Sequence, residues 1–278
     1  MKVDLHCHTS ASDGSLSPSE LLQRALERRI DCLAITDHDT TRGYEILQSE
    51  AEALPALNLI PGVEISCTWQ DRTIHIVALN FQVQQIELQT GLAQIRQKRQ
   101  ERAQAMLEKF QQHRHFNLPE MPQKLDRLVG DGVVGRGHFA ELLIREGRVK
   151  NTQQAFDRFL KKGRIGYVKA EWPDLQDVVG WIRNAGGIAV IAHPGLYKLT
   201  SRKLNLLIED FIEAGGQAIE VVNRPRASAD MIGMADRARR YGLYASAGSD
   251  FHRPEHSWRD LGWLAPLPPT VEPVWHLF

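Results

Sequence analysis

The stretch that decides the fold is residues 3–39, which read VDLHCHTSASDGSLSPSELLQRALERRIDCLAITDHD. It begins with a short apolar strand signal at 3–5, followed by a polar loop. The SPSE sequence at 17–20 is a capping box with proline at the first helical position, and leucine and alanine then recur at helical spacing. A second short apolar run at 32–35 ends in a TDHD motif. A strand, a helix and a strand in this order predict two parallel strands joined by a helix.

The same alternation continues outward along most of the chain. Further strands are expected at 57–65, 73–79, 187–192, 218–222 and 243–247. Helical patterns separate the later strands and lie at 174–185, 202–214 and 228–241. The sequence therefore predicts an α/β fold in which most strands are parallel.

Residues 88–172 behave differently because they contain helical patterns and no convincing strand. We expect this segment to be a mainly helical insertion, so that the α/β core consists of 1–87 and 173–278. The long helical pattern at 88–112 is rich in Gln and Arg, and the stretch 90–115 has a local charge of +4. Both a solvated helix face and a guide surface for an anionic polymer remain open for it.

The composition is that of an ordinary globular protein without net charge. The 278 residues include 34 Lys and Arg and 34 Asp and Glu. This balance argues against a protein that grips long nucleic acid duplexes by surface charge, because phosphate neutralisation needs an excess of basic residues. Three cysteines without a CxxC pair argue against thiolate metal sites and indicate a reducing compartment. With no apolar signal region and no run of about 20 apolar residues, we expect a cytoplasmic protein that does not bind membranes.

Histidine is the residue type that points to chemistry. Six of the 11 histidines stand in short motifs, most of them at expected strand ends, and acidic residues accompany them. The candidate metal ligands are His6, His8, Asp13, His38, Glu64, His75, His193, Asp250 and His252. Four of the other five histidines are expected to be surface or structural residues, namely His113, His115, His256 and His276, and the fifth, His138, stands in the GRGH sequence at 135–138.

These candidate ligands predict a metal cluster. Alternate residues of an extended segment point the same way, so His6 and His8 can reach one ion. The carboxyl ends of parallel strands converge on one face of a barrel. A lone strand histidine such as His75 is more often a packed core residue, but that explanation would have to hold for every motif at once. Imidazole and carboxylate suit Zn²⁺, Mn²⁺ or Fe²⁺ rather than Mg²⁺ alone, and nine ligands fit two or three ions that could assist phosphoryl transfer.

The complete motif set resembles the polymerase and histidinol phosphatase (PHP) phosphoesterases. The resemblance rests on HxHT…SDG (6–14), TDHD (36–39), PGVEIS (61–66), His75, AHPG (192–195) and GSDFH (248–252). Within the family the chain looks most like the bacterial nucleotide phosphoesterases that include RNase AM and the 3′,5′-nucleoside bisphosphate phosphatases. That closer likeness rests on ITDHDTT (35–41), LNLIPGVEIS (57–66), GRGHFA (135–140), GYV (166–168) and GSDFH. It covers essentially the whole chain.

The resemblance implies a distorted (β/α)7-type PHP barrel, with the helical insertion contributing to the substrate site. It also implies three divalent metal ions, for which Mn²⁺ is expected first and Fe²⁺ or Zn²⁺ are alternatives. The implied ligands are His6, His8, Glu64 and Asp250 for the first ion, Asp13, His38 and His252 for the second, and Glu64, His75 and His193 for the third.

Three further residues are expected at the catalytic site. Arg136 and His138 stand in the GRGH sequence of the insertion. A guanidinium suits bidentate phosphate recognition, and an imidazole can donate to the same phosphate or protonate the leaving oxygen. Asp37 is expected to orient its neighbours. Relatives often have proline in place of Gly137, and some have an Asn/Gly-rich stretch in place of the RPR at 224–226, so the loop geometry and the contacts to the leaving group or base stay open.

The resemblance implies an enzyme that hydrolyses phosphate esters of nucleotides. The implied activities are 5′→3′ exoribonuclease action on short or unpaired 5′-monophosphorylated RNA and removal of the 3′-phosphate from 3′,5′-bisphosphonucleosides such as pAp. Which substrate dominates stays open, as does a preference for RNA over DNA. No obligate protein partner is evident, and we expect a monomer. The alternatives are a small-molecule phosphatase such as histidinol phosphatase and a non-catalytic, metal-stabilised PHP module.

Overall fold

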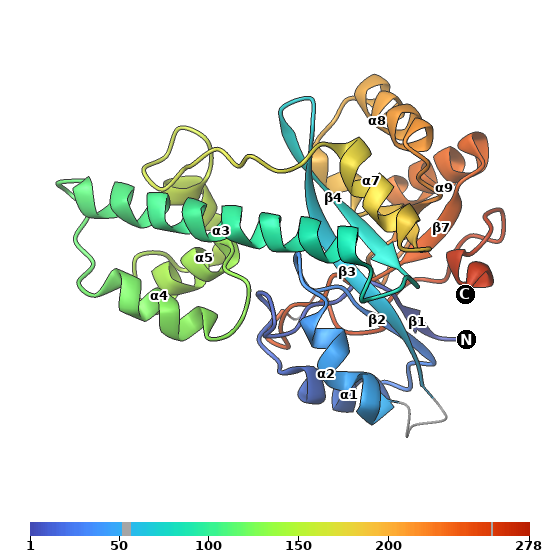
Figure 1. Ribbon diagram of the computed structural model, residues 1–278, viewed down its shortest axis with the longest axis horizontal. Coiled ribbons are helices and arrows are strands. Elements are labelled where there is room, and N and C mark those ends of the chain that lie inside the picture. The colour runs from blue at the N-terminus through green and yellow to red at the C-terminus, as the bar shows by residue number, and fades with distance from the viewer. Residues whose placement is uncertain (52–56, 257) are drawn as a thin grey trace.

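The centre of the molecule is one seven-stranded sheet whose strands are neighbours in chain order (Figure 1). The computed structural model describes residues 1–51, 57–256 and 258–278. The strands are β1 (Val3–Asp4), β2 (Cys32–Ile35), β3 (Asn58–Trp69), β4 (Arg72–Leu79), β5 (Ile188–Ile191), β6 (Ala218–Val222) and β7 (Tyr244–Ala247). All neighbours are parallel except β4, which is antiparallel to β3 and β5. The predicted α/β fold with mostly parallel strands is confirmed.

The sheet closes into a barrel because the chain beyond β1 pairs with the chain beyond β7. The backbone N–H of Leu5 donates to Ala247 O at 3.0 Å, and that of Asp250 donates to His6 O at 2.7 Å. A third bond joins His8 N to Phe251 O at 2.9 Å. The segments that carry the first and last histidine motifs are thereby held side by side, as the expected PHP barrel requires.

The antiparallel strand β4 arises from a tight hairpin that the sequence pattern does not predict. Strand β3 runs past the predicted end at residue 65, and Gln70 and Asp71 turn the chain back with φ of 45° and 61°. Positive φ at both central residues is the geometry of two-residue hairpin turns, which usually contain Asn or Gly. Here Gln occupies the first position, so the turn lacks its usual sequence signal.

Of the five helices beside the strands, four follow the sequence expectations closely, whereas the helix at Arg42–Ala51 was not predicted. The five helices are α1 (Pro18–Glu27), α2 (Arg42–Ala51), α7 (Leu175–Asn184), α8 (Ser201–Glu213) and α9 (Ala229–Tyr241). The predicted capping box is present, since Glu20 N donates to Ser17 Oγ at 3.3 Å and Ser17 N donates to Glu20 Oε2 at 2.7 Å. Two 3₁₀ turns lie at Pro194–Tyr197 and Val274–Leu277. Among the described residues, no helix combines the length and the apolar character needed to cross a membrane.

Residues 86–172, which follow β4, project from the barrel as a group of helices (Figure 1). Their elements are α3 (Ile86–Gln112), α4 (Met121–Val129), α5 (Arg136–Arg145), α6 (Thr152–Ala155) and a π-helical turn at Phe156–Leu160. The expected helical character is confirmed. Helix α3 begins in the main core through Leu88 and Ile95 and ends in a separate apolar cluster with Phe110. Because one helix belongs to both clusters, the division at 88 and 172 stays a prediction.

Candidate metal centre

All nine predicted ligand side chains meet at one end of the barrel, and Glu64 lies in their middle. Glu64 belongs to β3, and its Oε1 lies 2.8 Å from His193 Nε2 and 2.9 Å from His75 Nδ1. Its Oε2 lies 2.9 Å from His38 Nδ1 and 3.4 Å from His8 Nε2. Four strands or strand ends thus place imidazoles around a single buried carboxylate.

Two aspartates complete the cluster on the side of β7. Asp250 Oδ1 lies 3.5 Å from His8 Nε2 and 3.7 Å from His6 Nε2. Asp13, from the loop after β1, places Oδ1 3.3 Å from His252 Nε2. These carboxylates therefore approach the imidazoles that the sequence groups with them.

The residues present fit divalent metal ions. Four overlapping groups have ligand atoms within 4.8 Å of one another: His8, Asp13, His38 and His252; His6, Glu64 and His193; His6, His8 and Asp250; His38, Glu64 and His75. Buried atoms without a hydrogen-bond partner in the described part of the chain include Nε2 of His6 and His8, Oδ1 of Asp13, Nδ1 of His38 and Oε2 of Glu64. Buried polar atoms normally have partners, so this concentration indicates bound ions. How the ligands divide among the ions stays a prediction.

The side chains of the cluster differ widely in pKa. Burial opposes the charge of Glu64, but His75 and His38 hold the pKa of this carboxyl well below its usual range. Burial and the nearby His252 lower the pKa of His8 to about 3. Burial also disfavours a charged His252, yet Asp13 and Asp250 raise its pKa to about 9. At neutral pH the His8 imidazole is therefore uncharged and can bind an ion directly, whereas the His252 imidazole must first lose a proton.

A carboxylate behind the cluster orients two of the histidines. Glu220, on β6, is almost fully buried, with its Oε1 3.1 Å from His6 Nδ1. Its Oε2 accepts a hydrogen bond from the backbone N–H of His193 at 2.5 Å. A carboxylate at Nδ1 leaves Nε2 of the same ring available as a metal ligand. The sequence analysis missed Glu220, although an acidic residue within the apolar run AIEVV was a usable signal.

Asp37 lies behind the loop that carries His8 and Asp13. Its carboxylate is fully buried and accepts hydrogen bonds from Thr9 N at 2.7 Å, Thr9 Oγ1 at 2.6 Å and Ser12 Oγ at 2.6 Å. These contacts agree with an orienting role and do not bring the Asp37 carboxylate to a substrate.

A cavity of about 300 Å³ opens beside the cluster. Ligand side chains that line it are Asp13, His38, His75 and His252. The insertion contributes Arg99, Arg102, Arg136, Phe156 and Trp172, and the segment after β7 contributes Arg253, His256 and Arg259. Of these, the sequence analysis named Arg136 and the ligands alone, and it placed His256 among surface or structural residues.

The insertion's wall of the cavity carries two guanidiniums, those of Arg102 and Arg136, that pair with no carboxylate among the described residues. The Arg136 guanidinium makes no hydrogen bond or ion pair with the described residues and lies 5.3 Å from the Phe156 ring centroid. Arg102 donates to Val168 O at 3.1 Å and lies over the Trp172 ring. Burial and then the Arg136 and Arg99 guanidiniums lower the pKa of Arg102 to about 9. Such a wall favours an anion, since binding one relieves the repulsion.

His138 does not line this cavity, whereas Gly137 does. His138 is buried, and its Nδ1 accepts a hydrogen bond from Gly135 N at 3.1 Å, so it fixes the N-terminus of α5. Gly137 lies against Asp13, whose Oδ2 would be 2.6 Å from a Cβ at that position. Arg224 and Arg226 line a separate hollow of about 60 Å³ next to Glu220.

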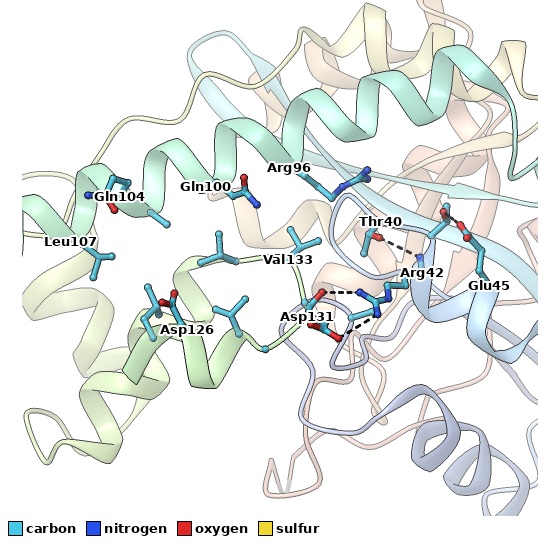
Figure 2. A pocket seen from close by; sticks show the side chains of 18 of the residues that line it. Thr40, Arg42, Glu45, Arg96, Gln100, Gln104, Leu107, Asp126, Asp131 and Val133 are labelled. Carbon is cyan, nitrogen blue, oxygen red and sulfur yellow. Dashed lines mark hydrogen bonds and ion pairs between the residues drawn. The ribbon is translucent and has the colours of Figure 1, made fainter. Parts of the chain in front are cut away.

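A second and larger cavity, of about 740 Å³, lies between α3, the start of α2 and the α4–α5 connection (Figure 2). Arg96, Gln100 and Gln104 line it from α3, and the Arg42–Asp131 ion pair borders it. None of the nine predicted ligands lines this cavity.

Comparisons with known proteins agree with this geometry. A family model for the PHP domain matches residues 4–184. The 5′-3′ exoribonuclease Rnm of Escherichia coli (strain K12) is 41% identical over 99% of this chain and 93% of its own length. The 3′,5′-nucleoside bisphosphate phosphatase of Chromobacterium violaceum is 41% identical over 98% of this chain and 95% of its own. A solved structure described as an amidohydrolase from Chromobacterium violaceum, with bound sulfate and no metal, superposes with a TM-score of 0.92 at 40% identity, covering 100% of this chain and 95% of that one.

Proposed function

Because the chain belongs to the PHP family, we propose that it is a metal-dependent phosphoesterase that hydrolyses phosphate esters of nucleotides. Its activity in this proposal is 5′→3′ exoribonucleolysis of short or unpaired 5′-monophosphorylated RNA. A 3′,5′-bisphosphonucleoside such as pAp is then the shortest substrate. The single observation that carries the proposal is the unpaired Arg136 guanidinium, which faces the same cavity as the ligand cluster.

Three divalent ions are part of the proposal, with Mn²⁺ first and Fe²⁺ or Zn²⁺ as alternatives. The nine ligands would hold them in the three sets that the family resemblance implies. When bound, such ions supply Lewis acidity at phosphoryl oxygens and a nucleophile at neutral pH. The cytoplasmic location and the monomeric state stay predictions.

The chain's own residues anchor the substrate by its 5′-phosphate. Arg136 and Arg102 bind the phosphate oxygens, while the Phe156 and Trp172 rings hold the two guanidiniums in place. Arg136 is the first residue of α5, so the positive end of the helix dipole adds to the attraction. His138 keeps that helix end in position. The 3′ ester of the anchored nucleotide then lies at the ligand cluster.

Steady-state kinetics with Mn²⁺ test this anchor. The substrates are pAp and one oligoribonucleotide with either a 5′-phosphate or a 5′-hydroxyl end. We expect kcat/KM to be about 100-fold higher for the phosphorylated oligomer, since two charge-assisted contacts are lost without it. Arg136→Met should remove most of this preference. Arg127→Met, an exposed position on α4, is the matched control and should leave it unchanged.

Two outcomes would contradict the proposal in different ways. Equal turnover of the phosphorylated and hydroxyl oligomers rules out the phosphate anchor. Rapid hydrolysis of histidinol phosphate, with neither pAp nor RNA cleaved, would instead identify a small-molecule phosphatase.

A further inference from the structure

A strand longer than one nucleotide needs a path out of the catalytic cavity. Its volume of about 300 Å³ is at the lower end of small-molecule sites. If the proposed function holds, the first nucleotide lies between Arg136 and the metal ligands and fills this space. The chain downstream of the scissile phosphate must therefore cross the cavity's rim.

The larger cavity of Figure 2 is a poor path for that chain. Its charged lining consists of Arg42 and Arg96 against Glu45, Asp126 and Asp131, a net charge of −1. Arg42 is already paired with Asp131 at 3.5 Å, and Arg96 donates to the backbone oxygen of Asp39 at 3.0 Å. Phosphates would meet a lining of net negative charge there.

The rim that carries Arg253, His256, Trp258 and Arg259 offers an aromatic surface instead. His256 lines the catalytic cavity, and the Trp258 ring stacks on it with 4.8 Å between centroids and 22° between planes. Trp258 does not line the cavity, so the stack extends outward from its edge. The Trp258 side chain is 64% exposed, which leaves ring surface for another flat partner.

This rim is tied to both sides of the site. Arg253 Nη1 lies 2.6 Å from Glu141 Oε2 of α5, and Arg259 Nη1 donates to Asp250 O at 2.8 Å. Two backbone hydrogen bonds also connect these residues, from His256 N to Arg253 O at 3.3 Å and from Arg259 N to His256 O at 3.0 Å. The aromatic pair therefore has a fixed place beside the ligand cluster.

We propose that Trp258, backed by His256, is the stacking platform for the nucleobase immediately downstream of the scissile phosphate. This inference rests on the proposed function. Stacking on an aromatic side chain tolerates every base, as an exonuclease requires, because every base has a π-face. A bisphosphonucleoside has no base downstream of its 3′-phosphate, so the platform acts on RNA and not on pAp.

Kinetics on the two substrates test the platform directly. Trp258→Ala should raise KM for a 5′-phosphorylated oligoribonucleotide about tenfold or more and leave KM for pAp within about twofold of the wild type, because pAp does not reach the platform. Trp258→Phe should restore most of the loss. Trp263→Ala, a second exposed tryptophan outside the cavity, should change neither. An oligomer with an abasic second nucleotide should bind the wild type weakly, with no further loss in Trp258→Ala.

The failure of this inference can be separated from failure of the proposed function. An unchanged oligomer KM in Trp258→Ala, or an equal loss on pAp, overturns the platform while wild-type hydrolysis of both substrates stands. A wild-type enzyme that cleaves neither substrate contradicts the proposed function and this inference with it.

Discussion

Gly248 shows how closely the cluster depends on single residues. It lies between β7 and Asp250, and a Cβ there would be 2.2 Å from His6 Cβ and 2.7 Å from His6 N. The backbone of His6 would have to move, so we expect Gly248→Ala to lower the free energy of unfolding by about 1–3 kcal/mol and to reduce bound metal. Urea denaturation and elemental analysis measure the two effects.

Gly180 provides the control for that substitution. It lies inside α7, and no atom is within 4 Å of a Cβ built there. Gly180→Ala should stabilise the protein by up to about 1 kcal/mol, because alanine favours the helix. Full metal content in Gly248→Ala would contradict the predicted displacement of His6.

Glu220 allows a test of the outer support of the metal ligands. In Glu220→Gln an amide N–H₂ group can face His6 Nδ1 and favour the tautomer in which Nε2 carries the proton. That nitrogen could then no longer bind an ion. We expect metal affinity to fall about 10- to 100-fold in a protein that still folds, measured by competition with a chromophoric chelator. Unchanged affinity would mean that Glu220 only fills space.

Some residues of this site could be predicted from the sequence, and others could not. That these nine side chains meet in one cluster was predictable because His, Asp and Glu recur at strand ends, where polar residues otherwise need an explanation. Arg102 and His256 were not, because their significance depends on which residues oppose them across the cavity. For His138 the structure adds a contact at the start of α5, where its Nδ1 accepts a hydrogen bond from Gly135 N, and its role toward the substrate stays a prediction.

At the scale of elements, Arg99 joins α3 to the strands that carry the ligands. This buried guanidinium contacts Asp39 Oδ2 at 2.6 Å through Nε and Ser66 Oγ at 2.9 Å through Nη2. Arg99→Met would leave the fully buried Asp39 carboxylate without its cation. We expect the free energy of unfolding to fall by about 3–5 kcal/mol, measured by urea denaturation.

An exposed position of the same helix is the control for this loss. Gln94→Met should change the free energy of unfolding by no more than about 0.5 kcal/mol. If Arg99→Met were equally harmless, α3 would be held by its apolar contacts alone.

Element type was easier to predict than element direction. Periodicity identified the strands and helices, because burial on one or both faces leaves a pattern in the sequence. The reversal of β4 depends on the Gln70–Asp71 turn, in which Gln70 has a positive φ that glutamine does not usually favour. The long helix α3 was predicted, but not that its two halves contact different apolar clusters.

At the scale of the whole molecule, a net charge of zero conceals a strongly uneven distribution. Five arginines line the catalytic cavity, whereas the cavity of Figure 2 has more acidic than basic residues. Neutrality therefore argues against binding long duplexes by surface charge and is compatible with holding one anionic end locally. Six of the 11 histidines belong to the proposed metal centre, which accounts for their abundance.

The stability of the fold and its affinity for metal should both depend on pH, through the protonation of His252. In the metal-free chain the pKa of His252 is raised from 6.5 to about 9, so this group stabilises the fold fully below pH 6.5 and progressively less as the pH rises through about 9. An ion bound by His252 must displace this proton. Its affinity should therefore rise up to about tenfold per pH unit and level off above pH 9.

Because of this competition, the stability of the chelator-treated protein and the increase in Tm caused by Mn²⁺ should change with pH in opposite directions. Between pH 6.5 and 8.5, the His252 contribution to the stability of chelator-treated protein falls, whereas the increase in Tm produced by Mn²⁺ grows because tighter binding stabilises the folded state more. Calorimetric titrations in buffers of different ionisation enthalpy would count the released protons. The variant His252→Asn should bind Mn²⁺ more weakly and lose part of the pH dependence, because, despite burial, carboxylates also raise the pKa of His6 and His38. Affinity that does not change with pH in the wild type would show that metal binding releases no proton from His252 and would contradict the predicted competition.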